Sequence, residues 1–202
     1  MAETSVKEQR ALKAQEALDN SDVLTSLIED LQGDSRRKRQ NAASVLSAVA
    51  ANDASALTAY SDVFVAALNR PEAQTRWECL DVLTHIVDIE SRSCDKAIPG
   101  AESALFDEES GPLHLAAMRF LCRLGSTTEN RSMKVWPLID EGIQCYHGDY
   151  EFQDMLVAVI GFSEGKLASD VAEQLKERMA FDAKNGKGML KKRAAQIVEN
   201  LS

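Results

Sequence analysis

The sequence predicts an all-α fold, an α-α superhelix of about five stacked helical hairpins with an extra N-terminal helix. Three observations lead to this prediction. Residues that favour helix over strand fill long uninterrupted stretches of the chain, and only 5% of the residues are aromatic. Apolar residues recur with the period of an α-helix. This apolar pattern itself recurs about every 38 residues, which is typical of repeat architectures.

The first expected helix covers residues 5–18. Ser5 and Glu8 have the spacing of a capping box, in which each side chain accepts a hydrogen bond from the backbone N–H of the other residue. We expect this helix to cap the first repeat. Because a chain of 202 residues typically forms one domain, the expected organisation is a capping helix over residues 1–20 and a single repeat domain over residues 21–202.

The repeat is clearest in the second helix of each hairpin. Equivalent apolar patterns begin at steps of 37, 38, 38 and 39 residues, at Ala42, Cys79, Ala117, Met155 and Ala194. The residues three, four and seven positions further along are apolar in every copy. That spacing places them on one face of an α-helix, so five helices are expected to bury equivalent stripes.

The first helix of each hairpin is expected between these copies. The segments with helical character are residues 21–31, 56–68, 97–106, 133–146 and 167–181. Pro99 and Pro137 lie 38 residues apart, and each is expected near the start of such a helix, where the missing N–H of proline is harmless. Turn-forming residues such as Gly33 and Gly125 fall between the expected helices.

Charge and hydropathy narrow the classes of function. The net charge of -9 argues against a general nucleic-acid binder, because neutralising phosphates requires clustered Lys and Arg. The first ten residues are polar, unlike a signal peptide, and no apolar run is long enough to span a membrane. We therefore expect a cytoplasmic protein without membrane contact.

The residue types of common catalytic and metal sites are present without the necessary spacing. The four cysteines, at positions 79, 94, 122 and 145, contain no C-x-x-C pair and are expected to be reduced and structural. Cys145 and His147 could begin a metal site only with ligands from distant segments. No nucleophile motif, paired histidines or phosphate-binding loop is apparent. The sequence therefore predicts no cofactor, no metal and no catalytic activity.

Helix pairs repeated at this length resemble the HEAT and armadillo classes of α-solenoid, over residues 21–202. In those classes the hairpins stack, and the second helices line a groove that binds proteins or peptides. The resemblance implies a non-catalytic interaction or scaffold module with a protein or peptide partner.

The same register predicts which side chains point away from the core. These outward positions lie two residues before the start of each stripe, and two, five and six residues after it. In the second and third repeats they hold Trp77, Asp81, Thr84, His85, Leu115, Arg119, Cys122 and Arg123.

We expect a partner-binding patch formed by Trp77, Asp81, His85, Arg119 and Arg123. Asp81 and Arg119 hold equivalent places in successive repeats and could form an ion pair. Trp77 could anchor a partner, because large aromatic side chains dominate many interfaces. Packing of Trp77 on the neighbouring hairpin is the other interpretation.

Two further features leave alternatives open. Residues 155–162 are apolar nearly all round, with Val157 and Ile160 on the expected open face, so another part of the chain, a second copy or a partner should cover them. A homodimer is one hypothesis. Basic residues cluster at 36–39 and 184–193, either as solvated helix ends or as sites for an anion or an acidic partner.

The string Trp77-Glu78-Cys79-Leu80-Asp81 resembles the Trp-x-x-x-Asp element of HEAT-like alkylpurine DNA glycosylases. That resemblance implies that Trp77 stacks on a base, that Asp81 stabilises a developing cation and that Arg119 stands for the catalytic arginine. It covers five residues, and the expected basic groove is not apparent. A glycosylase-related protein is therefore the alternative to the interaction module.

Overall fold

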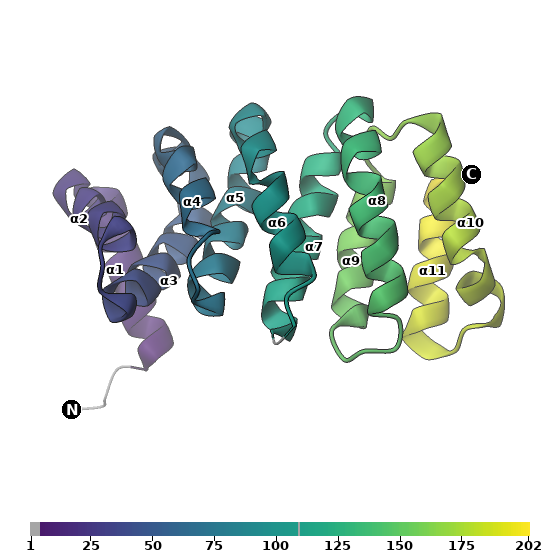
Figure 1. Ribbon diagram of the computed structural model, residues 1–202, viewed down its shortest axis with the longest axis horizontal. Coiled ribbons are helices and arrows are strands. Elements are labelled where there is room, and N and C mark those ends of the chain that lie inside the picture. The colour runs from purple at the N-terminus through teal and green to yellow at the C-terminus, as the bar shows by residue number, and fades with distance from the viewer. Residues whose placement is uncertain (1–4, 109) are drawn as a thin grey trace. The chain divides into compact units, whose positions relative to one another are not determined.

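A computed structural model describes residues 5–108 and 110–202, and over these residues the chain contains helices and no strand (Figure 1). The predicted all-α fold is confirmed. The chain divides into two compact units, Met1–Gly100 and Ala101–Ser202. Helix α6 (Ile98–Leu105) crosses the division between them.

The first unit has two layers of helices. Helices α1, α3 and α5 pack on one another in that order, and α2 and α4 pack on α3 and α5 from the other layer. The elements are α1 (Val6–Asp19), α2 (Ser21–Gln32), α3 (Arg36–Asp53), the 3-10 helix η1 (Ala54–Tyr60), α4 (Ser61–Ala67), α5 (Ala73–Cys94) and the 3-10 helix η2 (Asp95–Ala97).

The second unit repeats this arrangement. Helix α9 packs between α7 and α11, while α8 packs on α7 and α10 packs on both α8 and α11. The elements are α7 (Gly111–Gly125), α8 (Glu129–Cys145), α9 (Phe152–Ser163), α10 (Ser169–Asn185) and α11 (Gly188–Asn200). No helix in the described part of the chain combines the length and the apolar character that crossing a bilayer requires.

The predicted stripe is the core of both units. All five residues that begin it are buried, as are almost all of the residues three, four and seven positions later. The exceptions are half-buried, and they lie in the last two copies: Ala158, Val198 and Leu201. The stripe accounts for the packing of α3, α5, α7, α9 and α11.

The N-terminal helix begins at the predicted capping box. The Ser5 N–H donates to Glu8 Oε2 at 2.7 Å, and the Glu8 N–H donates to Ser5 Oγ at 3.3 Å. Ala14 and Ala17 are almost fully buried, which lets α1 pack closely on α3. The division into a capping helix and a single domain over residues 21–202 stays a prediction.

Two elements differ from the sequence prediction. Pro137 lies inside α8 and not near its start, because the Thr128 hydroxyl accepts a hydrogen bond from the Arg131 N–H and begins the helix at Glu129. Residues 56–68 form η1 followed by α4 instead of one helix. Tyr60 departs from helical geometry between them (φ -105°, ψ 12°).

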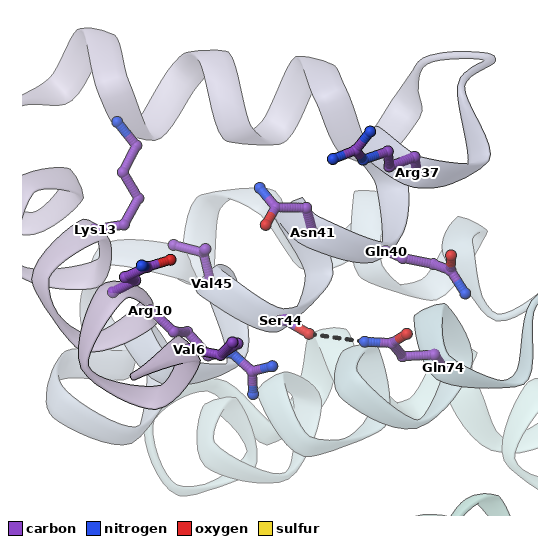
Figure 2. Close-up of a pocket in the computed structure, with 10 residues that line it drawn as sticks. Val6, Arg10, Lys13, Arg37, Gln40, Asn41, Ser44, Val45 and Gln74 are labelled. Atoms are coloured by element: carbon purple, nitrogen blue, oxygen red, sulfur yellow. Dashed lines mark hydrogen bonds between the residues drawn. The ribbon is translucent and has the colours of Figure 1, made fainter. Parts of the chain in front are cut away.

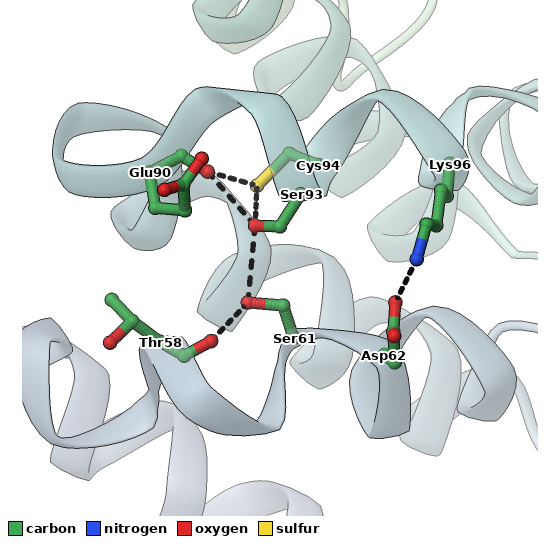
Figure 3. Close-up of polar contacts among 7 residues, drawn as sticks. All are labelled: Thr58, Ser61, Asp62, Glu90, Ser93, Cys94 and Lys96. Atoms are coloured by element: carbon green, nitrogen blue, oxygen red, sulfur yellow. Dashed lines mark hydrogen bonds and ion pairs between the residues drawn. The ribbon is translucent and has the colours of Figure 1, made fainter.

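Helix α5 is interrupted near its end. Glu90 has non-helical geometry (φ -140°, ψ 66°), and the hydroxyl of Ser93 donates to the Glu90 carbonyl at 2.9 Å (Figure 3). The same Ser93 hydroxyl lies 3.2 Å from the Ser61 hydroxyl, which donates to the Thr58 carbonyl at 2.6 Å. These contacts fasten the end of α5 to η1 and α4.

Candidate functional site

The predicted patch is divided between the two units. Trp77, Asp81 and His85 lie on α5, and Arg119 and Arg123 lie on α7. His85, Arg119 and Arg123 are exposed, whereas Trp77 and Asp81 are half-buried. The five residues as one patch, and the ion pair between Asp81 and Arg119, stay predictions.

One of the outward positions named in the second and third repeats was wrongly predicted. Cys122 is 1% exposed, although the register placed it on the open face. Helix α7 packs against both α8 and α9, so it buries a wider arc than a single stripe requires. Thr84 is half-buried, and its hydroxyl donates to the Leu80 carbonyl at 2.7 Å.

The apolar face of α9 is only partly covered. Val157 is 50% exposed, and Ile160 is half-buried. The described residues therefore leave about half of Val157 exposed. A homodimer through this face remains a hypothesis.

The first unit contains a pocket of about 490 Å³ bordered by α1, α3 and α5 (Figure 2). We call it the α1–α3–α5 pocket. The residues that line it are predominantly polar or cationic, and they are Val6, Gln9, Arg10, Lys13, Arg37, Gln40, Asn41, Ser44, Val45 and Gln74.

Helical periodicity explains why these side chains converge. The four lining residues of α1 are spaced i, i+3, i+4 and i+7 from Val6, and the five of α3 are spaced i, i+3, i+4, i+7 and i+8 from Arg37. Each helix therefore presents one face to the pocket. Gln40 and Ser44 occupy the outward positions of the first repeat, equivalent to those of Trp77 and Asp81 in the second.

A hydrogen-bonded network crosses from α3 to α5 at the pocket. The Ser44 hydroxyl donates to Glu78 Oε1 at 2.6 Å and accepts from Gln74 Nε2 at 3.0 Å, as Figure 2 shows for the second bond. Arg10 of α1 contributes an ion pair, with Nη1 3.8 Å from Glu78 Oε1. The network orients the hydroxyl and two of the polar side chains that line the pocket.

A buried ion pair supports the same helices. Arg39 and Glu72 are 7% and 6% exposed, and an Arg39 Nη2 hydrogen bond joins them. Arg39 Nη1 also donates to the Gly33 carbonyl at 2.9 Å. The hydrogen bond from Arg39 is the main cause that holds the pKa of Glu72 below its usual value. The start of α5 is thereby tied to the turn between α2 and α3.

The lining residues offer charge and hydrogen-bonding groups to a ligand. Arg10, Lys13 and Arg37 supply positive charge, and the carboxamides of Gln40 and Asn41 can both donate and accept hydrogen bonds. In the described ranges, no group of three or more His, Cys, Asp or Glu residues is placed to hold a metal ion.

The second unit has a depression of about 550 Å³, lined by Trp136, Asp140, Gln174, Glu177, Arg178 and Phe181. Its polar groups largely satisfy one another. Trp136 Nε1 donates to Gln174 Oε1 at 2.8 Å, and Arg178 Nε donates to Asp140 Oδ1 at 2.6 Å. We therefore regard the α1–α3–α5 pocket as the stronger candidate.

The sequence prediction missed this pocket. The sequence does contain Arg10 and Lys13 at positions i+4 and i+7 from Val6, so that they share one helix face. The basic cluster at residues 36–39 was also considered as a site for an anion or an acidic partner. What the sequence lacked was the packing of α1 beside α3, which brings the two sets of cations together.

Comparisons with known proteins identify the fold. No family model and no curated protein matches the sequence. A designed armadillo repeat protein superposes with a TM-score of 0.77 at 13% identity, over 99% of this chain and 96% of that one. A second such design, in complex with the peptide (KR)4, gives 0.77 at 13% identity, over 96% and 89%.

A natural protein shows the same likeness. Kap121p, solved bound to Nup53p, superposes with a TM-score of 0.77 at 15% identity, over 97% of this chain but only 21% of Kap121p. At sequence identities this low, the structural similarity establishes the fold and does not identify a ligand. The chain has the HEAT/armadillo-type helical repeat fold.

Proposed function

We propose that the protein is a non-catalytic interaction module that binds a protein or peptide along the second helices of its repeats. The observation that carries the proposal is the α1–α3–α5 pocket, which is bordered by α3 and α5, two of the helices expected to line such a groove, and by the N-terminal helix α1. The predicted patch of Trp77, Asp81, His85, Arg119 and Arg123 belongs to the proposed binding surface on α5 and α7.

The polar side chains in the pocket suit an extended peptide. A carboxamide can donate to a peptide carbonyl and accept from a peptide N–H, so Gln40, Asn41 and Gln74 match the groups that every peptide backbone carries. Fold neighbours were solved with the peptide (KR)4, with Nup53p and with the SUMO protease Ulp1p, which supports a peptide or protein as the ligand.

A displayed library of random short peptides, selected on the immobilised full-length chain, tests the proposal. We expect peptides that bind one site and compete with one another. Asn41→Ala removes a carboxamide and should lower the affinity for these peptides by about five-fold, the effect of losing one hydrogen bond. Trp77→Ala tests whether the site extends along α5.

The matched control is Gln32→Ala, which removes an exposed carboxamide from α2 in the other layer. Its affinity for the selected peptides should equal that of the unchanged chain. Failure to select any competing peptide, or equal weakening by Gln32→Ala and Asn41→Ala, would refute the proposed groove.

A further inference from the structure

The α1–α3–α5 pocket carries a charge opposite to that of the whole chain. Three of its lining residues, Arg10, Lys13 and Arg37, are cationic, and no Asp or Glu is among the described residues that line it, in a protein of net charge -9. A concave site lined by one sign of charge attracts ligands of the other sign. The pocket therefore favours an anionic ligand.

Two nearby carboxylates, those of Glu78 and Glu16, are engaged with other groups of the chain. Glu78 is 7% exposed, accepts a hydrogen bond from Ser44 and lies 3.8 Å from Arg10. Glu16 pairs with Lys13 at 2.9 Å, but both side chains are about half exposed, and such a pair on one helix is weak and readily exchanged. Arg10 is thus partly neutralised within the chain, whereas Lys13 can turn to a ligand.

Helix α3 is unusual in its charge. Residues 36–39 are all basic and stand at the positive end of the helix dipole, and its first turn holds no acidic residue. Among the described residues, two of the four side chains form ion pairs: Lys38 pairs with Asp30 at 2.9 Å, and Arg39 pairs with buried Glu72.

Arg37 is the one of these four that lines the pocket. Its side chain makes no ion pair or hydrogen bond with another described residue. Lys13, Arg37 and Asn41 all line the pocket, so two cations from different helices share it with one carboxamide (Figure 2). An anionic group bound beside Asn41 would supply a negative charge to pair with the guanidinium of Arg37.

The lining residues favour an acidic peptide over a nucleic acid. Proteins that bind single-stranded nucleic acids stack bases on aromatic side chains, and none of the described lining residues is aromatic. Carboxamide and hydroxyl groups beside cations can instead bind a peptide backbone and its acidic side chains together.

We propose that the α1–α3–α5 pocket binds an extended, acidic segment of a protein partner. Lys13 and Arg37 contact its carboxylates, and Gln40, Asn41 and Gln74 contact its backbone. This inference rests on the proposed peptide-binding function, and it deepens it by naming the charge of the ligand. That charge is opposite to that of the (KR)4 peptide bound by one fold neighbour.

The charge of peptides selected from the random library tests the inference. We expect enrichment in Asp and Glu. A labelled peptide from that set should bind about three- to five-fold more weakly to Arg37→Gln and to Lys13→Gln, as expected for one exposed charge contact each. Added NaCl should weaken binding by the unchanged chain, and less so binding by the double variant.

Neighbouring positions supply matched controls with the same loss of charge. Arg36→Gln and Lys38→Gln change exposed residues of α3 that do not line the pocket, and should alter the affinity by less than about two-fold. Circular dichroism should show all four single variants folded, because none of the four replaced residues is buried.

The outcomes separate this inference from the proposed function. Selected peptides that compete for the pocket but are neutral or basic would overturn the inference and leave the function standing. Equal effects of the pocket and control variants would also overturn it, because the attraction would then be unspecific. Tighter binding of a single-stranded oligonucleotide than of the acidic peptide would overturn the inference, because the ligand would then be a nucleic acid. A library that yields no binder would remove both proposals.

Discussion

At the scale of single residues, the ion pair between Arg39 and Glu72 has the largest expected effect on stability. Both side chains are buried, and breaking one partner of such a pair leaves the other charge without compensation in a site of low polarity. Arg39 also holds the Gly33 carbonyl, and Glu72 is the residue that precedes α5. The pair thereby links three segments of the first unit.

We expect Glu72→Gln to lower the free energy of unfolding by roughly 2–3 kcal/mol at neutral pH, because a neutral carboxamide replaces the buried carboxylate partner of Arg39. Urea unfolding followed by circular dichroism measures the change. Glu29→Gln, on the exposed face of α2, is the control and should change the unfolding free energy by less than about 0.5 kcal/mol.

The same variant has a signature in pH. The pKa of Glu72 is lower in the folded protein than its ordinary value of 4.5, so its contribution to stability is present above pH 4.5 and is lost as the pH falls toward the folded pKa. Glu72→Gln should therefore lose less stability than the unchanged chain when the pH is lowered below 4.5. Parallel pH profiles of the two proteins would contradict this assignment.

The cysteines should differ sharply in reactivity. Cys79, Cys94 and Cys122 are buried, and burial raises the pKa of the thiols of Cys79 and Cys122 far above the usual value, which suppresses the reactive thiolate. Cys145 is exposed. A maleimide should modify Cys145 alone in the native protein and all four thiols in denaturant, as read by mass spectrometry. Rapid native labelling of Cys122 would mean that α7 does not pack as described.

At the scale of elements, the sequence predicts burial better than it predicts helix ends. The stripe that begins at Ala42 and its equivalents is buried because helical spacing alone places these residues on one face. The start of α8 was misplaced because Pro137 suggested a first turn, whereas the Thr128 cap begins the helix earlier. Cys122 was misplaced because the apolar periodicity of the α7 sequence does not show that two neighbouring helices pack on α7.

Loop contacts are a second property that periodicity does not reveal, and Gly165 tests one of them. A Cβ atom at Gly165 would lie 2.6 Å from the Ser126 carbonyl oxygen and from Ser126 Cα, both backbone atoms, while the neighbouring Lys166 N–H donates to that carbonyl at 2.8 Å. Gly165→Ala should therefore separate the α9–α10 loop from the α7–α8 turn and destabilise the protein by about 2 kcal/mol in urea unfolding.

Gly161 offers a glycine control in the preceding helix. It lies within α9, is exposed, and a Cβ atom there would meet no neighbour within 4 Å. Because alanine favours helix over glycine, Gly161→Ala should raise the free energy of unfolding by about 0.5–1 kcal/mol. Opposite signs for the two substitutions are the expected result, and loss of stability in both would contradict the described surroundings of Gly161.

At the scale of the whole molecule, the repeat predicts which layer carries the pocket without predicting its chemistry. Gln40 and Ser44 follow from the register, but Arg10 and Lys13 enter the site because α1 packs on α3, a contact between segments about thirty residues apart. The amphipathic pattern of α1 is weak, so the sequence predicts a capping helix there and does not indicate that α1 lines a pocket. Tertiary packing supplied the missing information.

The repeat architecture also predicts which helices a local defect affects. Each hairpin contacts mainly its neighbours, so stability is close to a sum of local terms, and a defect should loosen the nearest helices first. Gly165→Ala should therefore speed amide hydrogen exchange in α7 and α9 more than in α3 and α5, with Gly161→Ala as the reference. Mass spectrometry of peptic fragments resolves the two units. Equal acceleration in all four helices would show that residues 21–202 unfold as one cooperative domain, whereas exchange confined to residues 101–202 would show that the two compact units open separately.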